Sequence, residues 1–299
     1  MEQFDVVVVG QGYAGLKAAS LALAKGLRTA TLEGSMAGGL IVSINELDPV
    51  PGGAMISGAE LTGGMAMENM DNGVDTKFSA ASQLRRDDDG WIIASDEGEC
   101  RAANVVIATG ARFRRLGVPG EAELIGRGVS ECADCDGPLY QGKDGVIVGG
   151  GDSAFQEALA LAHYAARVTI VMRGDTPRAR ADLVAQVAAA PNITLLPRTE
   201  VSAILGDAQS GVTGVRLRSD GGVERDLDCA SVFVFVGLEA QSQVVPDDVE
   251  RDEAGAIVTA GNCAANLPGL WAIGAVRRGF GGLLSDADAD AARVIAALS

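Results

Sequence analysis

Short apolar runs, glycine-rich turns and alanine- and leucine-rich segments follow one another twice along this chain. Residues 4–9 form an apolar run, and residues 16–25, after a glycine-rich turn, have the composition of a helix. A second apolar run at residues 28–32 is followed directly by Glu33. This order predicts a strand, a helix and a second strand of a parallel sheet.

The same order returns in the second half of the chain. An apolar run at residues 145–148 precedes a glycine turn, a helical segment that ends near Tyr164 and a strand at residues 168–172. Two such units predict an α/β protein with two Rossmann-like domains. Other strands are expected at residues 74–86, 91–95, 105–108, 212–218, 231–236 and 270–274.

Turn and cap signals mark the remaining segments. The acidic run at residues 87–90 predicts a solvated hairpin tip, and the glycines and proline of residues 116–120 predict a linker between domains. Ser285 and Asp288 have the spacing of a capping box, so a helix is expected to begin there, with a dipole that favours an anionic ring at its start. Residues 58–72 suit a helix whose apolar side chains fill the core or an interface rather than form a ligand site: Leu61, Met65, Met67 and Met70.

Composition narrows the class of protein. The 299 residues suffice for two domains, and 47% hydrophobic content indicates a globular chain. A net charge of −16 repels nucleic acid and anionic membranes, so neither is an expected partner. Residues 1–5 lack the positive region of a secretory signal, and Lys17 and Lys25 interrupt the longest apolar stretch. Five cysteines are too few for a disulfide-stapled secreted scaffold, so a cytoplasmic location is expected.

The glycine turn of the first unit has the sequence Gly10-Gln11-Gly12-Tyr13-Ala14-Gly15. Glycines at this spacing let the backbone approach a pyrophosphate at a helix N-terminus. Glu33, after the next strand, is placed to bind a ribose hydroxyl. A turn that needs glycine only for its own geometry is the alternative, but strand, helix and acid together favour a dinucleotide site.

The second glycine turn has the sequence Gly149-Gly150-Gly151-Asp152-Ser153-Ala154 and opens a second nucleotide-binding unit. Arg173, Arg178 and Arg180 follow the next strand of an otherwise acidic chain. Arginines at that place suit a ribose 2′-phosphate, which favours NADPH over NADH. A solvated basic loop is the alternative interpretation. His163, on the helix of this unit, is interpreted as an ordinary surface or interface histidine.

Cys132 and Cys135 carry the most specific chemistry in the chain. Two thiols at this spacing can close a disulfide, and one thiolate can attack an external disulfide while the other resolves the mixed intermediate. Asp136, beside the second thiol, is placed to move the proton, or it shapes the Asp-Gly-Pro turn. A zinc site is disfavoured because the other cysteines are solitary: Cys100, Cys229 and Cys263. An inert cysteine pair is the remaining alternative.

Two dinucleotide units and a dithiol together form an electron path from a nicotinamide to a flavin and then to a disulfide. The order of parts resembles the low-molecular-weight thioredoxin reductases among the pyridine nucleotide-disulfide oxidoreductases. As in that family, the cysteine pair lies in the second unit. The matching pieces span nearly the whole chain: residues 10–15, Glu33, Gly38-Gly39, Pro51-Gly52, Thr109-Gly110-Ala111, residues 132–137, residues 149–154 and Gly237.

The resemblance implies three-layer β/β/α domains, with an NADPH domain at residues 116–237 inserted between residues 1–115 and 238–299 of an FAD domain. It implies Cys135 next to the flavin, Cys132 attacking the partner disulfide and Asp136 as the acid. It also implies a homodimer and a rotation of the NADPH domain between the two half-reactions. The implied FAD contacts are Gly10, Gly12, Tyr13, Ala14, Gly15, Glu33, Gly38, Gly39, Leu40, Thr109, Gly110, Gly274 and Ala275. The implied NADPH contacts are Gly149, Gly150, Gly151, Asp152, Ser153, Ala154, Arg173, Arg178 and Gly237.

Several positions depart from the family pattern. Leu40 stands for a glutamine and Pro49 for an asparagine, both flavin contacts in the family. The family's Gly-Asp, which holds the ribitol, is Gly274-Ala275, and its Arg-Gln is Gly281-Gly282. Met172 and Gly174 replace a histidine and an arginine. Because each lost buried hydrogen bond costs about 1–3 kcal/mol, these changes are expected to weaken or reshape FAD binding.

Three hypotheses follow. The first is a flavin-dependent disulfide reductase that passes electrons from NADPH through FAD and Cys132/Cys135 to thioredoxin or a similar small dithiol partner. The second keeps the fold but changes the chemistry to a flavin dithiol oxidase, or to a reductase fed by ferredoxin. The third is a non-catalytic, redox-sensing nucleotide-binding protein.

Overall fold

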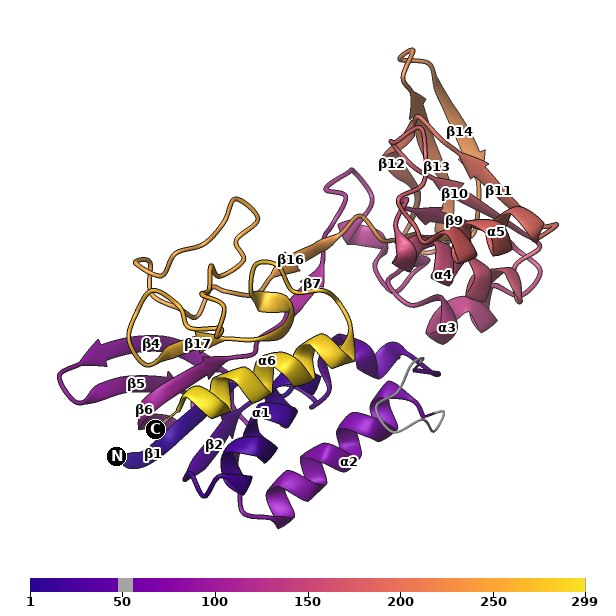
Figure 1. Cartoon of the computed structure of the whole chain (residues 1–299). Helices are drawn as coiled ribbons and strands as arrows, with labels where there is room; N and C mark the ends of the chain where they lie inside the picture. The colour runs from indigo at the N-terminus through magenta and orange to yellow at the C-terminus, as the bar shows by residue number, and fades with distance from the viewer. Residues whose placement is uncertain (48–55, 299) are drawn as a thin grey trace. The chain divides into compact units, whose positions relative to one another are not determined.

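A computed structural model describes residues 1–47 and 56–298 (Figure 1). The chain forms two compact units. The first unit contains Met1–Arg112 and Glu239–Ser299, and the second contains Phe113–Leu238. Two short strands, β7 (Ala111–Phe113) and β16 (Leu238–Ala240), pair with each other at the residues where the chain passes between the units.

A mainly parallel sheet forms the centre of the first unit. Strand β1 (Glu2–Val9) pairs in parallel with β2 (Thr29–Leu32) and β6 (Gly98–Ile107). Strand β3 (Asp75–Lys77) extends the sheet beside β2, and β17 (Leu270–Ala272) pairs with β6. Strands β4 (Ala81–Asp87) and β5 (Gly90–Ser95) add an antiparallel ribbon to β6.

Side chains alternate along each strand, so each strand contributes to a separate core on either face of the sheet. Val6 and Val8 of β1 point to helices α1 (Tyr13–Ala24) and α6 (Leu284–Ala297), which lie side by side (Figure 1). Val7 and Val9 point to the other face, where Trp91 and the segment around residues 245–257 close a second core. Helix α2 (Gly58–Asp71) packs against α1.

The second unit has three layers. Its central sheet is parallel, in the order β11 (Ile193–Leu196), β10 (Arg167–Val171), β9 (Asp144–Val148), β15 (Ser231–Val234) and β8 (Val129–Ser130). Helices α4 (Asp152–Ala162) and α5 (Ala181–Ala189) cover one face. An antiparallel sheet covers the other, made of β12 (Thr199–Asp207), β13 (Gly211–Ser219) and β14 (Glu224–Asp228). The one-turn helix α3 (Ala133–Asp136) packs against α4.

The structure corrects three local expectations. Residues 74–86 form two strands, because the chain leaves β3 after Lys77 and β4 starts at Ala81 to pair with β5. Helix α6 begins at Leu284, and the carboxylate that reaches back to the Leu283 N–H is that of Asp286, not Asp288. The Gly-Pro segment at residues 116–120 lies inside the second unit, where the Glu121 carboxylate accepts hydrogen bonds from the N–H groups of Leu116 and Gly117.

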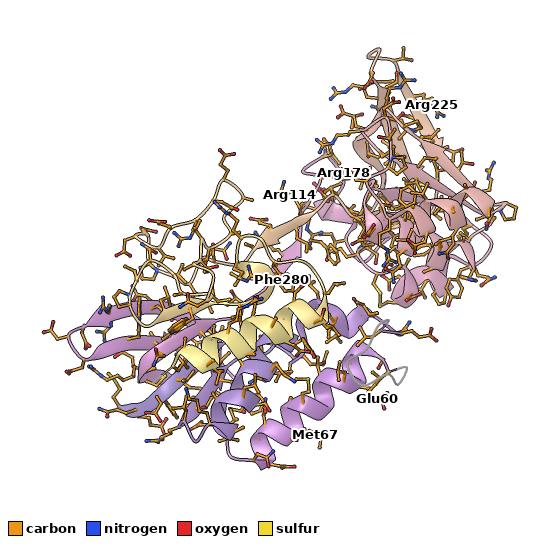
Figure 2. All side chains as sticks on the ribbon, viewed as in Figure 1. Glu60, Met67, Arg114, Arg178, Arg225 and Phe280 are labelled. Atoms are coloured by element: carbon orange, nitrogen blue, oxygen red, sulfur yellow. A yellow bond between two sulfur atoms is a disulfide. The ribbon has the colours of Figure 1, made fainter. Side chains whose placement is uncertain are left out.

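Two of the three methionines of α2 do not fill the core of the chain. Met67 is 68% exposed and points away from the helix into solvent (Figure 2), and Met70 is also exposed. The buried face of α2 is made of small and polar residues instead, including Thr62 and Asn69. The Asn69 side-chain amide donates to the backbone carbonyl of Leu16, so a polar contact fixes this helix against α1. Among residues 1–47 and 56–298, no helix is long and apolar enough to cross a membrane.

Candidate active site

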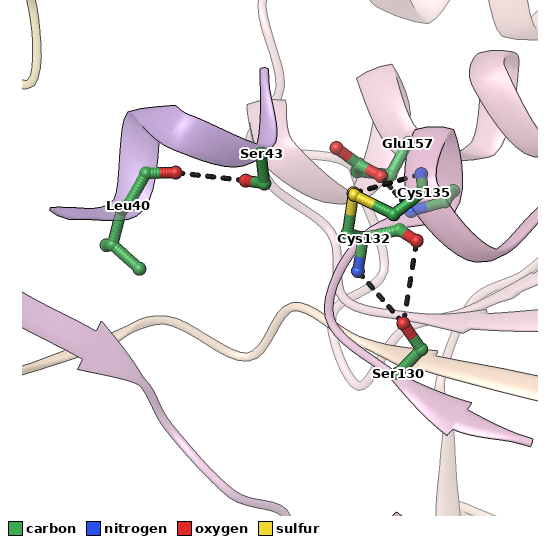
Figure 3. The surroundings of a disulfide bond; sticks show 7 residues. Leu40, Ser43, Ser130, Cys132, Cys135 and Glu157 are labelled. Carbon is green, nitrogen blue, oxygen red and sulfur yellow. Dashed lines mark hydrogen bonds between the residues drawn. A yellow bond between two sulfur atoms is a disulfide. The ribbon is translucent and has the colours of Figure 1, made fainter. Parts of the chain in front are cut away.

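Cys132 and Cys135 form a disulfide in the second unit, with their Cα atoms 5.3 Å apart (Figure 3). The Cys132 N–H donates to the Ser130 hydroxyl at 3.1 Å, and the Cys135 N–H donates to Cys132 Sγ at 3.1 Å. Cys135 is exposed and Cys132 is half-buried. These two backbone hydrogen bonds hold the pair in place, while the exposed Cys135 stays within reach of a reactant.

Asp136 ends the helical turn that begins just after Cys132. Its N–H donates to the Cys132 carbonyl at 3.1 Å, so Asp136 and the disulfide belong to one small loop. Gly137 follows because a Cβ there would lie 2.8 Å from the ring of Tyr164. Burial, and to a smaller degree the charge of Asp136, raise the pKa of the nearby Tyr140 hydroxyl.

Glu157 of α4 is a partner of this loop that the sequence analysis missed. Its carboxylate accepts a hydrogen bond from the Ala133 N–H at 2.6 Å, between the two cysteines. Burial raises the pKa of Glu157 to about 7, and the charge of Asp134 adds to the increase. The only local signal for this role is an acid five residues into a helix, which is common on helix surfaces.

The other cysteines do not compete with the pair. Cys100, Cys229 and Cys263 are free and buried. Burial raises the pKa of Cys229 to about 12 and that of Cys263 to about 11, so both thiols stay protonated and poorly nucleophilic at neutral pH. Within the described part of the chain, no three acidic, histidine or cysteine side chains form a metal site. His163 is exposed at the end of α4, as expected for an ordinary surface histidine.

A cavity of about 470 Å³ opens in the first unit beside the glycine turn. Its walls come from the ends of β1, β2 and β6, the loop after β17 and the start of α6. Of the residues expected to contact FAD, the cavity wall contains Gly10, Gly12, Tyr13, Ala14, Glu33, Gly38, Gly39, Leu40, Thr109, Gly110, Gly274 and Ala275. Gly15 lies outside the wall, within the same turn.

The three glycines of this turn have different reasons to be glycine. A Cβ at Gly10 would lie 2.5 Å from the Ala108 carbonyl oxygen, and one at Gly15 would lie 2.0 Å from the Gly10 oxygen. A Cβ at Gly12 would meet no atom within 4 Å, because that side faces the cavity. Gly10 and Gly15 are thus required by packing, whereas Gly12 leaves room for a ligand. Gly12 caps α1 without a side-chain hydrogen bond, which leaves the first N–H groups of the helix for a pyrophosphate.

Glu33 is held at the end of β2 by its neighbours. One carboxylate oxygen accepts from the Gln11 N–H at 2.9 Å, and the other accepts from the N–H and hydroxyl of Ser35. A carboxylate has further lone pairs, so it can still accept from the hydroxyls of a ribose. With the open face at Gly12, these contacts fit the adenosine and pyrophosphate part of FAD.

Several positions that depart from the family pattern lie at or beside this cavity. Leu40 and Ala275 form part of its wall, and Gly281 is small because a Cβ there would lie 2.3 Å from an Asp286 carboxylate oxygen. Within the described residues of the wall, Glu33 is the only carboxylate, so no acid replaces the family aspartate at position 275. Pro49, Pro51 and Gly52 lie outside the described residues.

A buried carboxylate nearby fixes the cavity wall without entering it. Asp290 of α6 has no exposed side-chain surface and accepts from the Gly274 N–H at 3.0 Å. Arg277 donates to both oxygens of Asp290, at 2.6 and 2.7 Å, and Arg293 donates to one at 3.2 Å. The Cys263 thiol also donates to Asp290, at 3.5 Å. Asp290 therefore holds the Gly274 turn through two cations, one thiol and one backbone N–H.

A second cavity, of about 800 Å³, lies in the second unit at its own glycine turn. Gly149, Gly150, Arg173 and Arg178 form part of its wall. A Cβ at Gly149 would lie 2.3 Å from the Phe235 carbonyl oxygen, whereas one at Gly151 would meet nothing within 4 Å. The turn thus repeats the arrangement of the first unit, with one packed and one open glycine. Its helix α4 likewise begins without a side-chain cap.

The basic loop is held against this turn. The Arg178 N–H donates to the Gly150 carbonyl, and the Arg180 N–H donates to the Asp152 carboxylate, both at 2.7 Å. Arg180 pairs with Asp182, but in the part of the chain that is described neither Arg173 nor Arg178 forms an ion pair. Two uncommitted guanidinium groups at the cavity fit a 2′-phosphate. Asp152, Ser153 and Ala154 start α4, and Gly237 lies outside the wall with φ +113°.

Comparison with known proteins agrees with this arrangement. Residues 4–291 match the family described as pyridine nucleotide-disulphide oxidoreductase. The chain is 37% identical to a thioredoxin reductase of Treponema pallidum over 276 residues, which covers 92% of this chain and 89% of that protein. It is 36% identical to a thioredoxin reductase of Mycolicibacterium smegmatis, with 90% and 87% covered.

Solved structures confirm the predicted fold. The structure of Lactococcus lactis thioredoxin reductase matches with a TM-score of 0.93 at 32% identity, and covers 98% of this chain and 97% of that one. The thioredoxin reductase of T. acidophilum matches with a TM-score of 0.92 at 31% identity, and covers 100% and 98%. Both support an α/β fold with two dinucleotide-binding domains, and proteins of this kind use FAD and NADPH. The chain belongs to the pyridine nucleotide-disulphide oxidoreductase family, as a flavin disulfide oxidoreductase of the thioredoxin reductase kind.

Proposed function

We propose that this protein reduces a disulfide of thioredoxin, or of a similar small dithiol partner, with electrons from NADPH. The observation that carries the proposal is the disulfide at Cys132 and Cys135 in a chain with two separate glycine-turn cavities. We assign FAD to the cavity of the first unit and NADPH to that of the second. Bound there, NADPH would supply the two electrons of each cycle and FAD would pass them to the disulfide.

The residues of the first unit have defined tasks in this proposal. The N–H groups of the first turn of α1, next to Gly12, donate hydrogen bonds to the pyrophosphate. The Glu33 carboxylate accepts hydrogen bonds from the ribose hydroxyls. The Gly38-Gly39 turn, Leu40, Thr109-Gly110 and Gly274-Ala275 form the rest of the wall. Because Ala275 has no hydrogen-bonding side chain, the ribitol end of FAD relies on backbone groups and on apolar contact, for example from Phe280.

In the second unit, Arg173 and Arg178 bind the 2′-phosphate and so select NADPH over NADH. Gly150 and Gly151 admit the pyrophosphate at the start of α4, and Asp152 holds the basic loop in place through the Arg180 N–H. Ser153, Ala154 and Gly237 complete the turn and its surroundings.

The dithiol carries the transfer to the partner. With the pair reduced, the Cys132 thiolate attacks one sulfur of the partner disulfide, the partner S–S bond breaks and a mixed disulfide forms. Cys135 then attacks Cys132 Sγ, which releases the partner as a dithiol and restores the Cys132–Cys135 bond. Asp136 gives the proton that the leaving partner thiolate takes up. We further propose that the protein is a homodimer and acts in the cytoplasm.

An anaerobic absorbance titration with NADPH, and then with NADH, tests the cofactor assignment. Bleaching of the flavin by NADPH at low concentration is expected, with a much weaker response to NADH. Flavin that NADPH does not bleach would favour an oxidase or a ferredoxin-fed reductase, and purified protein without flavin would favour a non-catalytic role.

Replacing Cys135 by serine tests the dithiol. Cys135→Ser is expected to keep flavin bleaching by NADPH but to abolish reduction of thioredoxin. Cys229→Ala, at a buried and free thiol of the same unit, is the matched control and should keep both. Sustained turnover by Cys135→Ser would overturn the proposed path.

A further inference from the structure

The carboxylate of Glu157 meets the redox loop at the point between its two cysteines. The carboxylate accepts a hydrogen bond from the Ala133 N–H at 2.6 Å. Ala133 is completely buried and is the first residue after Cys132. Glu157 itself belongs to α4, a different element, and Figure 3 shows its carboxyl beside the disulfide. A change of charge at Glu157 therefore acts directly on the backbone that carries both sulfurs.

The surroundings of Glu157 disfavour a negative charge on its carboxyl beside that of Asp134. Burial is the main reason why the pKa of Glu157 rises to about 7, and Asp134 of α3 is the charged neighbour that raises it further. Elements β9, β10, β11 and α5 also pack on α4, but none of their described residues has a charge that acts on this carboxyl. A thiolate formed by reduction of the disulfide would add like charge to the same place, which favours proton uptake by the carboxylate.

We propose that Glu157 is a positioning residue for the Cys132–Cys135 pair and holds one proton when the disulfide is reduced. The proposal rests on the proposed function only in that the pair is redox-active. On reduction, the S–S bond accepts two electrons and breaks. One proton goes to one sulfur and the second to the Glu157 carboxylate, which leaves a thiolate on the other sulfur. When the Cys132–Cys135 bond forms again, the pair gives up two electrons and the sulfur-bound proton, and Glu157 releases its proton to solvent.

The test is an equilibrium between the flavin-loaded enzyme and a dithiothreitol buffer of fixed oxidised-to-reduced ratio. It runs at pH values on both sides of about 7, the pKa of Glu157. Alkylation and mass analysis of the peptide with Cys132 and Cys135 give its reduced fraction. Neither NADPH nor a partner protein is present, so a failure to reduce thioredoxin, which would sink the proposed function, leaves this measurement unaffected.

Glu157→Gln keeps the hydrogen-bond acceptor and removes the charge. Above pH 7 it is expected to favour the reduced pair by about tenfold, or about 30 mV for two electrons. Well below pH 7, where wild-type Glu157 is protonated, the two curves should converge. Glu131→Gln is the matched control, since Glu131 precedes Cys132 but pairs with Arg115 at 3.6 Å, and it should follow the wild type. A constant offset at every pH, no offset, or an equal effect of Glu131→Gln would overturn the proposal.

A wild-type measurement keeps the proposal testable if Glu157→Gln does not fold. Reduced-minus-oxidised infrared spectra at slightly alkaline pH should show a new protonated carboxyl band. The same difference spectrum of Cys132→Ser, in which the pair cannot form, provides the background. Absence of the band after this subtraction would contradict proton uptake by Glu157.

Discussion

Removing the carboxylate of Asp290 is expected to destabilise the first unit strongly. In Asp290→Ala, the Arg277 guanidinium loses both of its hydrogen bonds to the carboxylate while its side chain stays only 14% exposed, and the Gly274 N–H loses its acceptor. Removing one partner of a buried ion pair costs about 3–5 kcal/mol, because the other charge is left without compensation. Arg293 is half exposed and adds little to this loss.

The two tryptophans of the chain provide a local probe for this prediction. Trp91 and Trp271 both belong to the first unit, so their fluorescence follows the unfolding of that unit in urea. All variants are compared at saturating FAD, because a bound ligand adds its own stabilisation. For a unit of this size, 1 kcal/mol corresponds to about 2–4 °C, so the melting temperature should fall by roughly 6–20 °C.

Three variants separate the charge effect from other causes. Asp290→Asn keeps the volume and one acceptor, and should lose less stability than Asp290→Ala. Glu99→Ala removes an exposed carboxylate that bonds Arg85 at 3.0 Å, and should cost about 1 kcal/mol or less. The double variant Arg277→Met with Asp290→Leu removes both charges and should recover a large part of the loss. If Asp290→Ala costs no more than Glu99→Ala, the account of this cluster is wrong.

Three more predictions concern the two cavities and Glu157. Gly12→Val fills the open side of the first glycine turn, so it should lower FAD affinity about 5- to 150-fold in equilibrium dialysis with little change in fold. In Gly10→Ala, by contrast, the new Cβ would lie 2.5 Å from the Ala108 oxygen at a residue with φ +104°. That variant should lower the yield of folded protein instead. The double variant Arg173→Gln with Arg178→Gln should raise the KM for NADPH about 10- to 100-fold and leave the KM for NADH unchanged. The control Arg225→Gln, on β14 of the same unit (Figure 2), should change neither KM. Equal effects on both nucleotides would refute the 2′-phosphate assignment. The folded-state pKa of Glu157 is raised from 4.5 to about 7, so ionisation of this carboxyl opposes folding. The stability of the wild type should therefore fall as the pH rises from 4.5 to about 7, and that of Glu157→Gln should change less. Hydrogen exchange of α4 measures both.

The sequence was most informative where a requirement is local. Each glycine turn was readable because a short stretch must combine a strand end, a tight turn and a helix start, and the structure places these features together at a cavity in both units. The cysteine pair was readable for the same reason, since the two cysteines of the disulfide are only three positions apart in the sequence.

The contacts that were missed depend on residues far apart in the sequence or on weak patterns. Glu157 meets Ala133 across 24 positions, and Asp290 meets Gly274 across 16, so neither pairing leaves a local signal. Helix α2 was expected, but its buried face was not: Thr62 and Asn69 are buried there, whereas Met67 and Met70, expected in the core or at an interface, are exposed in this chain. At the start of α6, three aspartates at alternate positions made the capping residue ambiguous, and Asp286 has the role.

The discontinuous first unit sets an order in which the protein can be completed during synthesis. Residues 1–112 leave the ribosome before the second unit, but β17 and α6, which complete the sheet and its helical cover, are made only after it. The second unit is continuous from Phe113 to Leu238, so it can finish folding while the first still lacks its C-terminal segment. Until then, the edge of β6 and the apolar surface of α1 have no permanent cover, which makes the nascent chain at this stage a candidate substrate for chaperones.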